Sequence, residues 1–379
     1  METPQGAEEE ERVSPELRRV VVIGTGLIGT SIALALRERD VDVLLADRDA
    51  ASVRLAVELG AGSALAEAGA GPADLAVLAV PPAAVAATLR DAQKRGLAAA
   101  YTDVASVKAA PLADAAELGC DLGSYVPGHP LAGRERSGPA AARADLFLGR
   151  PWALCPGADS SDGAVAAATA LARACGAEPV TMDPEEHDRA VALVSHAPHV
   201  VSAAMAARLV AGSGTALGLS GQGLRDVTRI AAGDPELWLG ILGANAEPVA
   251  DILEGVASDL ALAASALRAG ADAGRAGAEA AAELVADLLR RGNAGRVTIP
   301  GKHGGRQPRY TIVSVLIPDR PGELALLFQA AGVAGVNIED VVIEHSPGRP
   351  VGVVELSVRP AAAERLADEL RRRGWSVPG

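Results

Sequence analysis

The sequence predicts an α/β protein of three domains: a parallel sheet with helices on both faces, an all-helical region and a small α+β module. Over residues 19–128, short and almost wholly apolar runs alternate with amphipathic stretches, the pattern of buried parallel strands joined by helices. After residue 182, long Ala- and Leu-rich helical stretches dominate. A chain of 379 residues is long enough for two or three domains of about 150 residues each.

The apolar runs give the elements of the first domain, residues 18–182. The predicted strands are residues 19–24, 41–46, 74–80, 99–104 and 124–128, and a first helix covers residues 27–39. Pro81 and Pro82 end one strand, and a helix follows them to about Lys94. Together these elements form a doubly wound sheet. The acidic residues 1–17 lack periodicity and predict a disordered tail.

The rest of the chain divides into three segments that differ in composition and in predicted secondary structure. Residues 183–292 contain no convincing strand, and their helices are broken at 212–214 and 233–235. Residues 293–309, rich in Gly, Arg and Pro, predict a linker. Residues 310–379 follow the order βαββαβ, the order of a ferredoxin-like module. Its predicted elements are strands 310–317, 336–344 and 351–358, helices 321–333 and 361–373, and a short final strand.

Composition excludes several classes of protein. The 35 Lys and Arg against 48 Asp and Glu give a net charge of −13, which argues against a nucleic-acid-binding protein. The three cysteines form no CxxC pair, so a disulfide framework is not expected and a reducing cytoplasm fits best. There is no basic signal-peptide start and no run of about 18 apolar residues free of Pro and His. We therefore expect a soluble, cytoplasmic protein without a membrane span.

A glycine-rich turn follows the first predicted strand and opens a helix. It reads Gly24-Thr25-Gly26-Leu27-Ile28-Gly29. In this context GxGxxG is the dinucleotide-binding fingerprint of a Rossmann-type domain, in which Gly24 permits the turn, Gly26 lets a pyrophosphate approach and Gly29 allows close packing. Asp47 ends the second strand, where a carboxylate accepts hydrogen bonds from a ribose 2′-hydroxyl, so NAD is favoured over NADP. Arg48 is a counter-indication, because a guanidinium there could hold a 2′-phosphate.

Two further polar clusters follow strands at the ligand-binding edge of such a sheet. In the first, Ser106 could bond a substrate or a catalytic imidazole, and Lys108 offers a cation. Ser106 could equally be the N-cap of a helix. In the second, His129 lies in a Gly- and Pro-rich loop. A lone histidine is more often structural, but its place on the cofactor edge makes it a candidate base for oxidation of an alcohol.

The helical region carries the third cluster. His196 and His199 are i, i+3 neighbours on one helix face, but without HExxH, a nearby cysteine or a third histidine we expect no metal site. Arg229 is a candidate bidentate clamp for a carboxylate. Alternatively, Arg229 pairs with Asp226 on the surface.

Taken in order, these pieces resemble the prephenate/arogenate dehydrogenase family of tyrosine biosynthesis. The matching strings are GTGLIGTS, TDVASVK, GHPLAGRERSG, EEHD, SHAPH and GLRDVTR, over about residues 19–290. The last module, with PDRPGEL at 318–324 and VNI at 336–338, resembles an ACT domain. Ala105 departs from the family pattern, in which Gly is common before the Ser, but a methyl group there should be tolerable.

The resemblance implies roles for individual residues. His129 matches the catalytic histidine that takes the hydroxyl proton as hydride leaves for NAD, and Ser106 matches the serine that orients it. Arg229 matches the arginine that binds the substrate carboxylate, and His199 a histidine of the substrate pocket. Three further residues match supporting positions in or near that pocket: Glu135, Asp226 and Trp238, the last at a position that the resemblance puts within reach of a neighbouring subunit. The family's helical domain dimerises, so a homodimer is expected.

The expected reaction is oxidative decarboxylation of prephenate with NAD. Arogenate, which has an amino group in place of the side-chain keto group, is the alternative substrate, and a 4-amino analogue is a further one. A non-catalytic amino-acid sensor is a rival from another class. For the ACT-like module we expect feedback inhibition by tyrosine at a pocket including Gly322, Asn337 and Ile338, with a role in assembly alone as the alternative.

Overall fold

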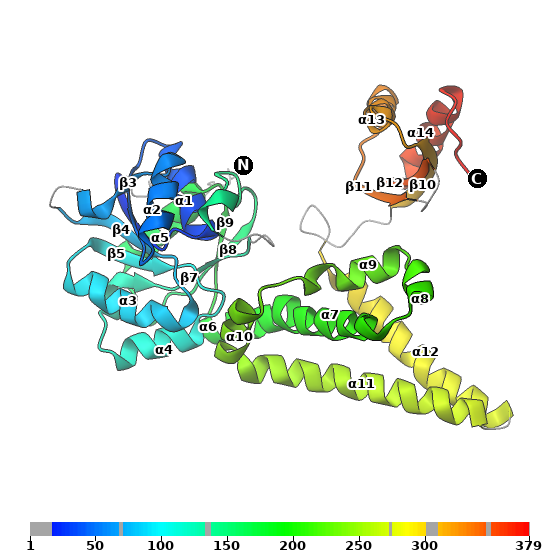
Figure 1. Ribbon diagram of the computed structural model, residues 1–379, viewed down its shortest axis with the longest axis horizontal. Helices are drawn as coiled ribbons and strands as arrows, with labels where there is room; N and C mark the ends of the chain where they lie inside the picture. Colours follow the sequence, from blue (N-terminus) through cyan, green and yellow to red (C-terminus); the bar gives the residue numbers. More distant parts are fainter. Residues whose placement is uncertain are drawn as a thin grey trace, which may run out of the picture. The chain divides into compact units, whose positions relative to one another are not determined.

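The computed structural model describes residues 17–67, 71–132, 138–272, 275–300, 310–345 and 350–378 (Figure 1). It divides into two compact units, Met1–Val256 and Ala257–Gly379, and each is considered by itself. Leu17, which the sequence assigned to the tail, is 8% exposed and belongs to the core of the first unit. Residues 1–16 of the predicted tail lie outside the described residues.

The first unit is built on a six-stranded parallel sheet in the order β3-β2-β1-β4-β5-β6. Its strands are β1 Arg19–Ile23, β2 Asp42–Ala46, β3 Ser63–Ala64, β4 Ala73–Leu78, β5 Ala98–Asp103 and β6 Tyr125–Val126. Residues alternate between two faces along each strand, so the sheet supports two cores. The helices are α1 Leu27–Arg37, α2 Ala50–Glu58, α3 Pro82–Lys94, α4 Ala109–Glu117 and α5 Asp162–Ala174.

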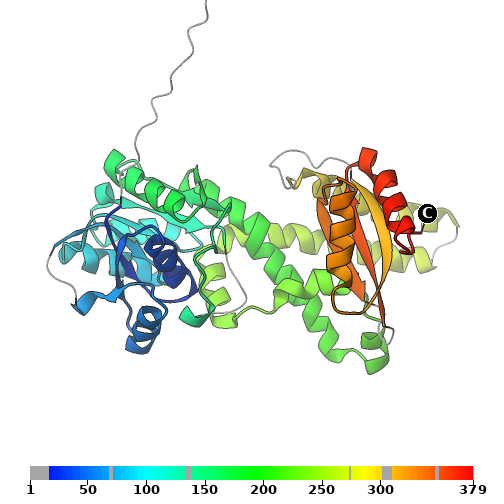
Figure 2. The same ribbon diagram turned by 90° about the horizontal axis from the view of Figure 1, so that it is seen from above.

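The two cores show which helices cover which face. Val20 and Val22 of β1 pack in one core with α1 and α5, whereas Val21 packs in the other with α3 and α4. The doubly wound sheet is therefore confirmed, with helices on both of its faces (Figure 2). The sequence prediction omitted β3, α2 and α5.

A second, three-stranded sheet in the order β7-β8-β9 was also missed. Its strands are β7 Gly128–Pro130, β8 Pro151–Leu154 and β9 Glu178–Thr181. His129 therefore lies in a strand that pairs antiparallel with β8, opposite Ala153, and its predicted position in a loop is wrong. The reason is local: Pro127 accepts a backbone hydrogen bond from Cys155, which aligns the two short strands despite their prolines.

The helical part of the first unit begins with a single long helix that contains a turn of π-helix. It comprises α6 Pro184–Val191, the π turn η4 Ala192–His196 and α7 Ala197–Arg208. After it come η5 Leu209–Ala211, α8 Gly214–Gly218, α9 Gln222–Thr228, η6 Arg229–Ala231, α10 Pro235–Ala244 and α11 Ala246–Asp272. The breaks expected at 212–214 and 233–235 are present, each followed by a helix with a Ser or Asp N-cap.

Among the helices of the described residues, Pro184–Ala211 would be long and apolar enough to cross a membrane by length and composition alone. A third of its most apolar window is buried in this unit. It also carries polar side chains that are buried here: His187, Asp188, His196, His199 and Ser202. These features fit a core helix, which meets the same criteria.

The second unit contains most of a helical hairpin and a small sheet. Arg291 of α12, Arg275–Thr298, bonds Asp259 of α11 at 2.8 Å and so links the two helices. The linker predicted at 293–309 is wrong for residues 293–298, because α12 continues through them despite Gly295; residues 301–309 lie outside the described part.

The small sheet has the antiparallel order β10-β12-β11, with α13 and α14 on one face (Figures 1 and 2). Its elements are β10 Thr311–Pro318, α13 Glu323–Val333, β11 Asp340–His345, β12 Val351–Val358 and α14 Pro360–Arg372. In place of a final strand, Ser376 forms an isolated bridge with Leu316.

Candidate active site

The glycine turn after β1 leaves no room for side chains at two positions. Gly24 has φ +107°, and a Cβ there would overlap the Ala79 carbonyl group. A Cβ on Gly29 would overlap the Gly24 carbonyl oxygen. Both glycines are therefore required by the fold, because they bring α1 against the end of the sheet.

Gly26 is different, and its surroundings fit a dinucleotide. A Cβ on Gly26 would meet no atom of the protein within 4 Å, so the space beside it is open. Gly26 is the N-cap of α1 and supplies no side-chain cap, which leaves first-turn N–H groups of this helix to a ligand. Leu27 and Ile28 of that turn are only partly buried. The residues present thus fit a pyrophosphate at the N-terminus of α1.

Asp47, just after β2, is held by the same turn. Its Oδ2 atom accepts hydrogen bonds from the Thr25 backbone N at 2.6 Å and the Thr25 hydroxyl at 3.2 Å, and its Oδ1 accepts from Asp49 N at 2.9 Å. These bonds fix the carboxylate beside the glycine turn, where a ribose would lie. Arg48 is exposed next to it.

Replacing Asp47 with Asn should lower kcat/KM for NAD and reduce the ratio of kcat/KM for NAD to kcat/KM for NADP. The amide keeps one acceptor, whereas the carboxylate offers two oxygens to the turn and a ribose. A hydrogen bond to a charged group contributes about 1.5–3 kcal/mol, so kcat/KM for NAD should fall roughly 10- to 100-fold. Asp49→Asn is the matched control, since Asp49 only caps α2. An unchanged NAD:NADP ratio of kcat/KM would contradict this role.

His129 makes its side-chain hydrogen bond to another histidine. Its Nδ1 atom lies 2.9 Å from Nε2 of His187 on α6, and the two rings meet edge to face at 5.1 Å. His187 Nδ1 lies 2.8 Å from Oδ1 of Asp188. His187 and Asp188 are buried, whereas His129 keeps partial exposure. The expected serine, Ser106, lies on the loop after β5, whereas the His129 ring bonds His187.

A buried ion pair supports the strand that carries His129. Lys108 Nζ contacts Asp103 Oδ1 and the Gly128 carbonyl oxygen, and both charged side chains are 0% exposed. Asp103 also accepts hydrogen bonds from the Tyr125 hydroxyl at 2.6 Å and Ala105 N at 2.8 Å. Burial and the Asp103 carboxylate raise the pKa of Tyr125 well above its usual value. This network joins β5, β6 and β7 at Gly128, the residue directly before His129.

Two alternatives from the sequence are thereby corrected. Lys108 is not a cation available to a substrate, because its ammonium group is enclosed and paired with Asp103. Ser106 is not the N-cap of the following helix. That helix, α4, begins at Ala109 with Lys108 at the N-cap, and the backbone N–H groups of Lys108 and Ala109 donate to the Asp188 carboxylate instead.

The other helical histidines form a cluster with Trp238 on α10. The His199 ring stacks on Trp238 with centroids 3.6 Å apart, and His196 meets the same tryptophan edge-on at 6.2 Å. A Cβ on Gly233 would overlap both Trp238 and His199. Asn245 Nδ2 lies 3.1 Å from His196 Nδ1 and 2.8 Å from the Asp188 carbonyl oxygen, which connects this cluster to the His129 site.

Arg229 and Asp226 lie near this cluster but are exposed. Arg229 begins η6, and the next residue, Ile230, accepts a hydrogen bond from the His199 ring. Asp226 accepts a hydrogen bond from Gln222 Nε2 at 2.8 Å. Glu135, also expected in the substrate pocket, lies outside the described residues.

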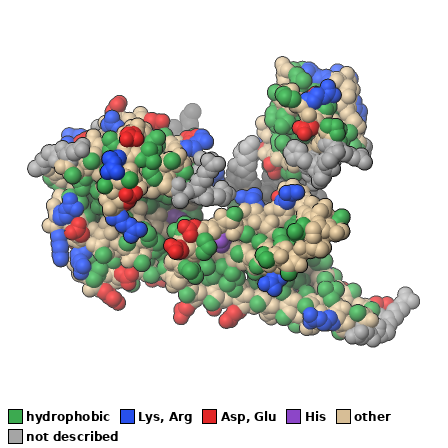
Figure 3. Space-filling view, in the orientation of Figure 1, with side chains coloured by type: hydrophobic (Ala, Val, Ile, Leu, Met, Phe, Trp, Pro, Cys, Tyr) green, Lys and Arg blue, Asp and Glu red, His purple; other side chains and the backbone are tan. Residues whose placement is uncertain are grey.

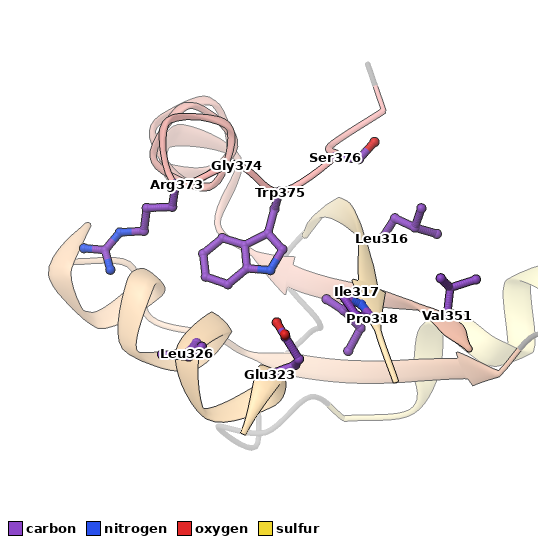
Figure 4. Close-up of a pocket in the computed structure, with 10 residues that line it drawn as sticks. All are labelled: Leu316, Ile317, Pro318, Glu323, Leu326, Val351, Arg373, Gly374, Trp375 and Ser376. Atoms are coloured by element: carbon purple, nitrogen blue, oxygen red, sulfur yellow. The ribbon is translucent and has the colours of Figure 1, made fainter. Parts of the chain in front are cut away.

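The second unit contains a pocket of about 610 Å³ between β10, the start of α13 and the segment after α14 (Figure 4). Trp375 forms one wall, and Glu323 and Arg373 supply its charged groups. Of the expected regulatory residues, Gly322 directly precedes Glu323 as N-cap of α13. The other two lie elsewhere: Asn337 Nδ2 bonds Glu339 at 2.8 Å, and Ile338 packs against the core.

Sequence reasoning missed His187, Asp188 and Asn245 as members of the site. The first two were part of the quoted string EEHD, so a signal existed. What the sequence lacked was the fold of α6 against β7 and α4, which brings residues 58 positions apart within 2.9 Å. Nothing in the sequence singled out Asn245.

Two family models match the chain in order. Residues 32–181 match the nucleotide-binding domain of prephenate dehydrogenase, and residues 183–275 match its dimerization domain. The probable prephenate dehydrogenase NovF of Streptomyces niveus is 43% identical over 361 residues, which are 95% of this chain and 99% of the relative.

Solved structures agree with these matches. Prephenate dehydrogenase from A. aeolicus, in complex with hydroxyphenyl propionate and NAD+, has a TM-score of 0.64 and 27% identity, covering 76% of this chain and 99% of that one. Synechocystis arogenate dehydrogenase has a TM-score of 0.59 and 27% identity, covering 73% and 98%. Because NovF resembles nearly the whole chain and both family models match it, this chain belongs to the prephenate dehydrogenase family.

Proposed function

We propose that this chain is an NAD-dependent prephenate dehydrogenase, which converts prephenate to 4-hydroxyphenylpyruvate and CO2 in tyrosine biosynthesis. The observation that carries the proposal is the bonded pair of His129 and His187, with His129 following β6 and the dinucleotide-binding turn following β1 at the carboxyl ends of strands of one parallel sheet. The 43% identity to a probable prephenate dehydrogenase supports the same reaction. NAD is the cofactor, as in the A. aeolicus structure solved with NAD+.

The substrate defines what the protein must supply. Prephenate is a 4-hydroxycyclohexadiene with a ring carboxylate and a pyruvyl side chain. When bound, NAD accepts the hydride from C4 of the ring. As that C–H bond breaks, the hydroxyl proton must leave. The bond to the ring carboxylate then breaks, its electron pair enters the ring to give CO2 and an aromatic phenolate, and the phenolate oxygen takes a proton back. Because aromatisation drives the reaction, the protein needs mainly to position the substrate and remove one proton.

His129 is the base in this proposal. Burial, together with the positive charge of Lys108 and with His187 and His196, holds the pKa of His129 well below the ordinary 6.5. The imidazole is therefore neutral at physiological pH and able to accept the C4 hydroxyl proton. Ser106, on the loop after β5, is the nearby hydroxyl group proposed to orient the ring or the substrate.

The helical region supplies the residues that are proposed to bind the substrate. Arg229 is exposed on η6 and offers a guanidinium for bidentate binding of a substrate carboxylate. His199 and Trp238 form an adjacent stacked wall. Two carboxylates on the substrate explain why cationic groups are needed in a chain whose net charge is −13. Glu135 and Asp226 are proposed to support this pocket.

We further propose that the chain is a cytoplasmic homodimer. Its helical region matches a dimerization domain and exposes large apolar residues, among them Val210 at 91% and Leu219 at 83%. Figure 3 shows hydrophobic side chains distributed over the surface of this region. A second copy would cover such a surface. Cys120, Cys155 and Cys175 are free thiols, which fits a reducing compartment.

Residues 310–379 are proposed to form an ACT domain that binds tyrosine. Its two helices on one face of an antiparallel sheet support this, and its pocket combines Glu323, Arg373 and an indole wall from Trp375. A carboxylate, a guanidinium and an aromatic surface are together suited to a zwitterionic aromatic amino acid. The lining of this pocket includes Glu323, the residue after Gly322, but not Gly322, Asn337 or Ile338.

Deleting residues 310–379 should abolish inhibition by tyrosine and preserve prephenate oxidation. The residues of the active site all precede Val256, and both family models end before the deleted segment. Initial rates with and without tyrosine, for the full chain and the deletion variant, measure the effect. A truncated chain that tyrosine still inhibits would place the effector site elsewhere, and a full chain insensitive to tyrosine would favour a role in assembly.

Arogenate is the second candidate substrate, since an arogenate dehydrogenase is among the structural neighbours. The two activities are separated by following NADH formation at 340 nm with prephenate and arogenate side by side, with NAD and with NADP. We expect the higher kcat/KM with prephenate and NAD. A preference for arogenate would move the assignment to the sister activity, with the same role for His129.

A further inference from the structure

We propose that His187, fixed by Asp188, is a positioning residue that keeps the proton of His129 on Nδ1 and leaves Nε2 free to act as the base. The role of Nε2 in catalysis rests on the proposed function. The arrangement of protons is a property of the protein itself and can be measured without a substrate.

The geometry forms a chain of three side chains. Asp188 Oδ1 lies 2.8 Å from His187 Nδ1, and His187 Nε2 lies 2.9 Å from His129 Nδ1. Both distances are those of hydrogen bonds, so each pair of atoms shares one proton. His187 and Asp188 are 1% and 4% exposed, so water does not readily compete for these bonds.

Counting protons along this chain gives the tautomer. An ionised carboxylate has no proton to donate, so His187 Nδ1 must donate to Asp188. A neutral His187 then has a lone pair at Nε2, which must accept from His129 Nδ1. Since a neutral imidazole has one N–H group, the Nε2 atom of His129 carries the free lone pair. The opposite tautomer of His129 would require His187 to donate from both nitrogens and become a buried cation.

Asp188 is itself held in place by the start of α4. Its Oδ1 accepts a hydrogen bond from Lys108 N at 2.8 Å, and its Oδ2 accepts one from Ala109 N at 2.9 Å. Asn245 bonds its carbonyl oxygen at 2.8 Å. Both carboxylate oxygens of Asp188 accept backbone N–H groups at the N-terminus of a helix, where a carboxylate is favoured, and these contacts fix its direction. The orientation of His187 thus follows from the packing of α6 on α4.

The charged groups around His129 favour a neutral ring before the reaction. The charge of Lys108, at the N-cap of α4, lowers the pKa of His129, and Lys108 is itself paired with Asp103 of β5. His196 of the π turn faces the same site, and burial lowers its pKa to about 4. When His129 takes a proton at Nε2, its Nδ1–H group is already bonded to His187, which stabilises the new charge toward Asp188.

Two substitutions of His187 separate positioning from packing. Glutamine can reproduce both bonds, because its amide N–H donates to Asp188 while its carbonyl oxygen accepts from His129 Nδ1. Leucine fills the space but can neither donate nor accept a hydrogen bond. We expect His187→Leu to lower kcat about 100-fold or more with little change in KM, and His187→Gln to stay within about tenfold of wild type. Arg189→Leu, at an exposed position of the same helix, should behave as wild type.

The direct readout is the ¹⁵N NMR spectrum of the histidine side chains in the full chain, with His129→Asn used to assign the His129 signals. We expect protonated Nδ1 and unprotonated Nε2 for His129 in the wild type and in His187→Gln, and the reverse in His187→Leu. A wild-type His129 protonated at Nε2 would overturn the inference. Equal kcat values for the Leu and Gln variants would also overturn it.

An error in the proposed function can be distinguished from an error in the inference about His187. If the wild-type chain oxidised neither prephenate nor arogenate but showed the expected ¹⁵N pattern, the function would be wrong and the inference about His187 would stand. If His187→Leu did not fold, the spectra of the wild type and of His187→Gln would still decide the tautomer.

Discussion

Replacing His129 with Asn should lower kcat about 10²- to 10⁴-fold and leave KM for prephenate nearly unchanged. The amide keeps a polar group of similar size in β7 but cannot take a proton from the substrate hydroxyl at neutral pH. Because that proton leaves in the transition state, the lost interaction affects kcat rather than ground-state binding. Steady-state kinetics with saturating NAD provide the measurement, and turnover close to wild type would show that another group is the base.

The pH profile provides an independent check on His129. Since its pKa lies below 6.5, the neutral form persists into mildly acidic solution. The acidic limb of kcat/KM should therefore have its midpoint below pH 6.5 in the wild type, with activity rising as pH increases through it. His129→Asn should lose this limb. His345→Asn, in β11 of the second unit, is the control and should keep the wild-type profile.

Replacing Lys108 with Met should destabilise the first unit by about 3–5 kcal/mol. Methionine fills much of the same space but leaves the Asp103 carboxylate buried without its cation, with only hydrogen-bond donors such as the Tyr125 hydroxyl around it. Urea unfolding measures the loss of stability. The transition of the first unit is identified as the one that moves to a higher urea concentration when NAD is added.

Two further variants test whether the buried charge is the cause. Adding Asp103→Asn to Lys108→Met removes the uncompensated carboxylate and should recover part of the stability. Arg143→Met breaks the exposed ion pair with Asp145 and should move the transition little, because both groups remain in water. If Lys108→Met unfolded at the wild-type urea concentration, the ion pair would not support the strand that carries His129.

The sequence predicts the doubly wound sheet and its cofactor turn well because both depend on local signals. Near-continuous apolar runs mark the buried strands, and the glycines at 24 and 29 are required because neighbouring backbone leaves no room for a Cβ. Together they mark the strand–turn–helix unit directly. The helical breaks after residue 211 and before Pro235 also carry their own turn residues. Such features need no knowledge of distant contacts.

The site was predicted less completely, because much of it depends on contacts between residues that are far apart in the sequence. Lys108 looks like a free cation in the sequence, and only the meeting of β5 with β7 reveals that it is enclosed by Asp103 and Gly128. Strands of three or four residues, such as β7 and β8, are too short to show alternation. The link from His129 to His187 depends on α6 packing across the end of β7. The helix at 293–298 shows the opposite case, in which α12 continues through exposed residues whose composition is typical of a linker.

The reaction itself is tested most directly by its stoichiometry. Purified full-length chain, incubated with prephenate and NAD, should form NADH, CO2 and 4-hydroxyphenylpyruvate in a 1:1:1 ratio, measured by absorbance at 340 nm, CO2 release and chromatography. NADH formed without CO2 would contradict oxidative decarboxylation. No NADH with prephenate or arogenate, using NAD or NADP, would contradict the proposed function as a whole.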